Sequence, residues 1–155
     1  MDEKLKRIIL HLQIQYAVFI FFVLLLGISY EMEWLPTGLY AIDPRMQYIL
    51  ETVGILVTIA FVPFSLKLYS RVYTRYIQNA PLLKALKLYE LWSSIRLLLL
   101  VVAVLLNIVV YYLTLDNIGG LCALIGITAS LFCLPGENKM RKEMNIEETH
   151  EINLK

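Results

Sequence analysis

Four long runs of apolar residues divide this chain, and they constrain its fold more than any other feature. The runs extend from Ile8 to Tyr30, Tyr48 to Leu68, Leu91 to Leu115 and Ile118 to Leu134. A helix needs roughly 17–25 predominantly apolar residues to cross a bilayer. Hydrophobic residues make up 59% of the 155 residues and charged residues 17%, whereas soluble domains are roughly 45–50% apolar and about 25% charged. The sequence therefore predicts an all-α, polytopic membrane protein whose four transmembrane helices form a bundle.

The runs and their connections divide the chain into two parts. Residues 1–136 form the predicted four-helix membrane domain, and residues 137–155 form a polar cytoplasmic tail of mixed charge. Between the second and third runs, apolar positions recur at helical spacing while basic residues occupy another face. Residues 69–90 are therefore predicted to form a helical hairpin that extends past the membrane on the cytoplasmic side.

Local signals indicate where the helices begin. Asp43 followed by Pro44 is typical of an N-cap with proline at the first helical position. Pro81 is expected to end one helix and start the next, and the pair Gly119-Gly120 predicts a tight turn into the fourth span.

The placement of the charges predicts the orientation in the membrane. The formal net charge is only +1, but a cytoplasmic N-terminus puts all of the 14 Lys and Arg residues except Arg45 on the cytoplasmic side. Short cytoplasmic loops carry an excess of Lys and Arg in membrane proteins. We therefore expect both termini to be cytoplasmic, in the inner or plasma membrane. The lipid bilayer is the expected surrounding, and no nucleic acid is expected as a partner because that would require a basic surface.

A seam of small residues is the most specific pattern in the fourth run. Small side chains let membrane helices approach closely, and dispersion contacts then hold the helices together. The fourth span is therefore expected to pack tightly, either against helices of this chain or against a second copy or another membrane protein. The seam consists of Gly119, Ala123, Gly126, Ser130 and Cys133.

Two polar residues in the runs form a candidate intramembrane pair. Glu51 is an acidic residue inside the second run, and Asn107 lies at a similar depth in the third. An intramembrane carboxylate is costly unless it is neutralised or paired, and the amide of Asn107 can donate a hydrogen bond to it. The pair has two interpretations, namely a structural hydrogen bond or a proton- or cation-coupled site.

A second polar cluster is predicted near the cytoplasmic side. His11 and Gln15 lie on one face of the first run, and Arg96 enters the third run by about one turn. If these residues meet, His11 can titrate near neutrality and report cytoplasmic pH. The alternative is a histidine that is simply solvated beside basic residues.

No enzyme motif accompanies these features. The aspartates Asp2, Asp43 and Asp116 all lie outside the runs, and no metal or cofactor motif occurs in the sequence. We therefore predict a non-enzymatic protein without a cofactor, acting as an accessory, regulatory or assembly subunit through protein–protein contacts in the membrane. The alternative is a small oligomeric transporter or channel with Glu51 and Asn107 in its path.

Overall fold

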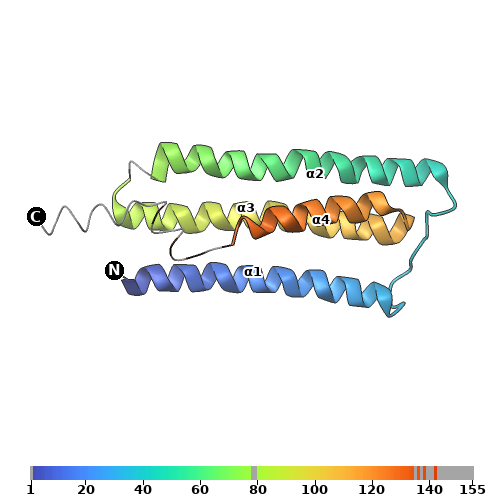
Figure 1. Ribbon diagram of the computed structural model, residues 1–155, viewed down its shortest axis with the longest axis horizontal. Helices are drawn as coiled ribbons and strands as arrows, with labels where there is room; N and C mark the ends of the chain where they lie inside the picture. The colour runs from blue at the N-terminus through green and yellow to red at the C-terminus, as the bar shows by residue number, and fades with distance from the viewer. Residues whose placement is uncertain (1, 78–79, 135, 137, 139–141, 143–155) are drawn as a thin grey trace, which may run out of the picture.

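The computed structural model describes residues 2–77, 80–134, 136, 138 and 142, and the regular secondary structure of these residues is all helical (Figure 1). A single turn of π-helix, η1, continues the second helix over Tyr73–Ile77. The α-helices are α1 (Asp2–Glu31), α2 (Pro44–Val72), α3 (Leu82–Thr114) and α4 (Asn117–Leu131).

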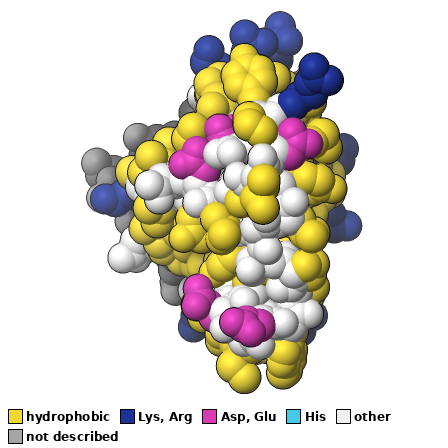
Figure 2. Space-filling model, turned by 90° about the vertical axis from the view of Figure 1, so that its right-hand side faces the viewer, with side chains coloured by type: hydrophobic (Ala, Val, Ile, Leu, Met, Phe, Trp, Pro, Cys, Tyr) yellow, Lys and Arg dark blue, Asp and Glu magenta, His cyan; other side chains and the backbone are white. Residues whose placement is uncertain are grey.

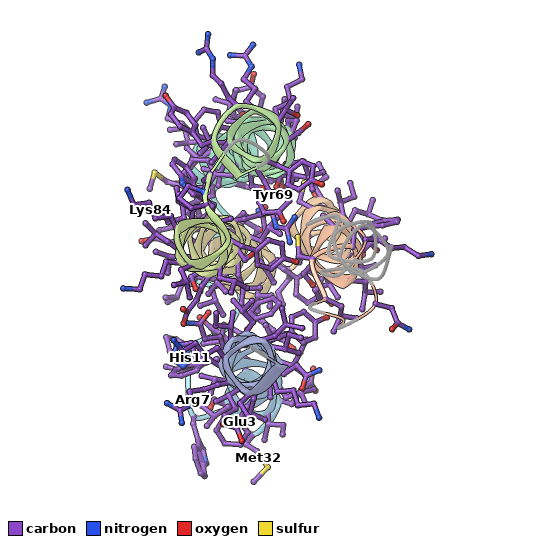
Figure 3. All side chains as sticks on the ribbon, turned by 90° about the vertical axis from the view of Figure 1, so that its left-hand side faces the viewer. Glu3, Arg7, His11, Met32, Tyr69 and Lys84 are labelled. Carbon is purple, nitrogen blue, oxygen red and sulfur yellow. The ribbon has the colours of Figure 1, made fainter. Side chains whose placement is uncertain are left out.

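The helices lie lengthwise beside one another with α3 in the middle. The N-terminus and the α2–α3 connection lie at one end of the molecule, and the α1–α2 and α3–α4 connections lie at the other (Figure 1). Seen from the end, α1 and α2 lie on opposite sides of α3, and α4 lies on a third side (Figure 3). In the most apolar 18-residue stretch of α3, 39% of the residues are buried. In the corresponding stretches of α1 and α2, the share is 17% each. The core is therefore organised around α3.

Three of the described helices, α1, α2 and α3, are long and apolar enough to cross a membrane. This confirms the prediction of an all-helical protein with several membrane-length helices. The remaining helix, α4, has 15 residues, which corresponds to about 22 Å of helix rise against roughly 30 Å for the hydrocarbon core. The helix α4 is thus shorter than the predicted fourth run, which continues to Leu134.

The N-terminus of α2 has the predicted N-cap. The side chain of Asp43 accepts hydrogen bonds from the backbone nitrogens of Arg45, at 3.1 Å, and Met46, at 3.5 Å. Pro44 occupies the first helical position, where its missing N–H costs nothing. The start of α3 after Pro81 was also predicted.

The prediction of a glycine turn before α4 was wrong. The chain reverses earlier, at Leu115, which adopts a left-handed conformation with φ 54°. Asp116 then caps α4 by accepting a hydrogen bond from the backbone nitrogen of Asn117 at 2.7 Å. Gly119 and Gly120 lie inside α4, where the missing side chain of Gly119 serves close packing rather than backbone reversal.

The two ends of the molecule differ in charge. The end with the α1–α2 and α3–α4 connections shows acidic side chains among hydrophobic ones (Figure 2), and Arg45 lies there in the first turn of α2. Basic residues such as Lys4, Arg71 and Lys84 lie near the opposite end. Most of the predicted tail, 137–155, lies outside the described residues.

Candidate functional site

The small-residue seam of α4 faces the interior of this chain. All of its members, Gly119, Ala123, Gly126, Ser130 and Cys133, are buried. A Cβ atom on Gly119 would lie 2.7 Å from the backbone nitrogen of Tyr111 and 2.9 Å from its Cα. A Cβ on Gly126 would lie 2.5 Å from the Cγ2 of Val104. The seam therefore brings α4 close to α3, and it is occupied within the molecule.

Asn107 joins α3 to α2, two turns before the end of α3. Its side chain is 1% exposed, and its amide nitrogen donates to the hydroxyl of Thr58 and to the carbonyl oxygen of Ala103, each at 2.8 Å. Gly54 makes room for it, because a Cβ there would lie 2.6 Å from the Oδ1 of Asn107. The amide of Asn107 thus donates to Thr58 rather than to Glu51.

Glu51 lies on the same face of α2 as Gly54 and Thr58, one and two turns before them. It is half-buried, and its buried Oε1 atom has no hydrogen-bond partner in the structure. The Oδ1 atom of Asn107 is also buried without a partner. The structure therefore leaves two oxygen atoms without donors at the α2–α3 contact.

The three residues of the predicted cytoplasmic-side cluster occupy different environments. His11 is exposed on α1, and in Figure 3 it lies on the same side of this helix as Arg7. The Oε1 atom of Gln15 accepts a hydrogen bond from the hydroxyl of Ser94 at 2.9 Å. Arg96 is 8% exposed, and its guanidinium lies 4.0 Å from the ring centroid of Tyr69 on α2.

Comparison with known proteins gives no functional lead. No family model, no curated protein and no solved structure matches the chain.

The helices α1 and α3 pack against each other near both of their ends. Near the N-terminus, Leu5 and Ile9 pack in one buried cluster with Leu86. At the other end the rings of Tyr30 and Tyr112 stack with their centroids 4.3 Å apart. These contacts fix the position of α1 along α3.

An apolar groove lies on the surface between these two packed regions. Its volume is about 530 Å³, and every residue that lines it comes from α1 or α3. The hydrogen-bonded pair Gln15 and Ser94 is the polar part of its lining. We refer to this feature as the α1–α3 groove; its lining includes Ile14, Val18, Phe22, Leu91, Leu98 and Val101.

Sequence reasoning did not find Ser94 or Ser93, although both lie near Arg96 in α3. The spacing of three residues between Ser93 and Arg96 places both on one helix face, and this signal was available in the sequence. Among residues 2–77, 80–134, 136, 138 and 142, no group of three or more His, Cys, Asp or Glu residues is placed to hold a metal ion.

Proposed function

We propose that this chain is a multi-pass protein of the cytoplasmic membrane, with four membrane-embedded helices and both termini in the cytoplasm. The bias of Lys and Arg toward the end that holds the N-terminus and the α2–α3 connection supports this orientation. The apolar composition of α4 and its tight packing against α3 support its placement in the membrane.

In this membrane the protein acts as a non-catalytic accessory, regulatory or assembly subunit that binds another membrane protein. The α1–α3 groove is the observation that carries this proposal. Because the seam of α4 is occupied by α3, it is not free for a partner, whereas the groove offers an open apolar surface to a further helix. The occupant that we propose is one transmembrane helix of a partner protein.

The chemistry of Gln15 favours a protein helix over lipid tails in the groove. Gln15 lies about 10 Å of helix rise inside the first apolar run. Its amide oxygen is bonded to Ser94, but its amide nitrogen has no acceptor among the residues that the structure describes. Polar side chains at membrane depth seek hydrogen bonds across helices. A partner helix with a Ser, Thr or Asn side chain at this level can accept from Gln15, whereas a lipid tail cannot.

Photo-crosslinking in native membranes tests this proposal. We expect a crosslinking residue at Val18 or Leu98, in the groove, to yield a discrete product with one partner protein. The matched control is Ile59 on α2, which is 65% exposed compared with 63% for Leu98. We expect the control to yield lipid adducts, and Gln15→Leu to lower the yield from Val18 about threefold or more, because an interhelical hydrogen bond in a membrane contributes about 0.6 kcal/mol on average. Lipid adducts alone from all positions would contradict the proposal.

A second candidate function rests on the unpartnered oxygens at the α2–α3 contact. Glu51 Oε1 and Asn107 Oδ1 are both buried without donors, and a proton or small cation would satisfy them. In this candidate, several copies of the chain form a transporter or channel with Glu51 and Asn107 in its path. Asn107 is fully enclosed within a single copy, so transport requires assembly or rearrangement of the chain.

Flux through proteoliposomes distinguishes the second candidate from the first. If Glu51 carries a proton or cation, Glu51→Gln is expected to reduce the flux at least tenfold, since it removes the ionisable group. Glu33→Gln makes the same chemical change at an exposed residue of the α1–α2 connection, and it serves as the control. Equal flux in the parent and Glu51→Gln vesicles rejects the transporter.

A further inference from the structure

Arg96 is a buried cation whose charge is incompletely compensated. Its side chain is 8% exposed, and its Nε atom is buried without a hydrogen-bond partner. Within the described part of the chain no carboxylate forms an ion pair with it. The ring of Tyr69, 4.0 Å from the guanidinium carbon, supplies a cation–π contact, but such contacts offset only part of the cost of a buried charge. The guanidinium of arginine is a cation with five N–H donors and no acceptor, so a partner of Arg96 must accept hydrogen bonds.

Two further unpartnered hydroxyl groups belong to residues beside Arg96. The Oγ atom of Ser93 and the Oη atom of Tyr16 are buried, and the structure gives neither a hydrogen-bond partner. Ser93 is 7% exposed and precedes Arg96 by one turn of α3. All three residues line one cavity between α1, α3 and the end of α4, together with Leu12, Tyr89, Leu97 and Cys133.

The size of this cavity restricts what it can hold. Its volume is about 10 Å³, which is room for the centre of a single water-sized particle. A phosphate, a carboxylate or a lipid headgroup is too large. The candidates are therefore one water molecule or one monatomic anion.

We propose that the cavity is a binding site for a halide-sized anion, with chloride as the physiological ligand. Each of the three groups can donate a hydrogen bond, and Arg96 can only donate. A water molecule would satisfy the hydrogen bonds, but it would leave Arg96 without a counter-charge among the residues that the structure describes. Chloride accepts the hydrogen bonds and also supplies the counter-charge. Chloride is larger than water, so its binding requires the lining of the cavity to expand, and the long side chain of Arg96 is the part of the lining that can move outward. This site is independent of the partner helix proposed for the α1–α3 groove.

Thermal unfolding of the purified full-length chain in mild detergent tests the anion site. A ligand that binds only the folded protein raises the unfolding midpoint by mass action. We expect the midpoint to rise with chloride concentration when gluconate replaces chloride at constant ionic strength, and bromide to act like chloride. Equal midpoints in chloride and gluconate would overturn the proposal and assign the cavity to water.

Variants of the lining assign the effect to this cavity. Ser93→Ala and Tyr16→Phe each remove one donor, and each is expected to weaken chloride binding about tenfold, as for the loss of a hydrogen bond to a charged group. Arg96→Gln is expected to abolish the chloride dependence. The matched controls Ser29→Ala and Tyr48→Phe make the same changes outside the cavity, at residues that do not line it. If Ser93→Ala and Tyr16→Phe respond to chloride as the controls do, the site lies elsewhere and the proposal fails.

Discussion

Replacing Gly119 by alanine is expected to destabilise the folded chain by about 1–3 kcal/mol, the usual cost of forcing extra volume into a packed contact. The new Cβ would lie 2.7 Å from the backbone nitrogen of Tyr111 and 3.0 Å from the carbonyl oxygen of Asn107. A backbone cannot move aside as a flexible side chain can, so α4 must shift away from α3. The measurement is the free energy of unfolding in detergent, followed by far-UV circular dichroism.

Gly27→Ala provides the control for this substitution. Gly27 also lies inside a helix, but a Cβ there would meet nothing within 4 Å. Both substitutions gain the same helix propensity, about 0.5–1 kcal/mol, so the difference between them isolates the packing effect. If the two variants are equally stable, α4 does not approach α3 as closely as the structure shows.

Replacing Asn107 by aspartate is expected to cost about 3 kcal/mol, close to the insertion penalty of a charged residue near the middle of a membrane helix. The aspartate cannot donate to Thr58 or to the carbonyl oxygen of Ala103, and these two hydrogen bonds are the ones that Asn107 makes in the structure. The result is a buried acid surrounded by acceptor atoms. The variant is therefore expected to unfold at a lower temperature than the parent.

Asn117→Asp makes the same chemical change at an exposed position. Asn117 begins α4, where a negative charge is tolerated by the partial positive charge of the helix N-terminus. We expect its unfolding free energy to stay within about 0.5 kcal/mol of the parent, as for most surface substitutions. An effect of Asn107→Asp as small as that of Asn117→Asp would mean that Asn107 is accessible to water.

The helical class and three of the four predicted long helices followed from the sequence, because membrane helices need long apolar runs. The fourth run gave a helix of only 15 residues. Asp43 and Pro44 also marked a helix start correctly, since capping depends on neighbours in the chain. Gly119 was misinterpreted as part of a turn. Glycine serves both chain reversal and close helix packing, and a pattern of small residues alone does not say which use applies at one position.

The contacts between helices were harder to predict. Glu51 and Thr58 share one face of α2, so the partner of Asn107 depends on how far α2 is displaced along α3, and the sequence carries no direct record of this displacement. Arg96 was grouped with His11 by depth, but its contact is Tyr69 on the opposite neighbour of α3. The depth of a residue along a membrane helix can be predicted from the sequence. The rotation of the helix about its own axis, which decides the neighbour that a residue faces, is set by packing between helices.

The attachment of α1 to α3 alone among the α-helices has a consequence for biosynthesis. The contacts of α1 are formed with α3, which begins at Leu82, fifty-one residues after α1 ends at Glu31. Chains are made from the N-terminus, so α1 leaves the ribosome before α3 exists. It must therefore persist as a lone helix until α3 is made, and its most apolar stretch, with a mean hydropathy of 2.2, is apolar enough for α1 to cross a membrane by itself. The helix α1 is made early and packs against α3 late.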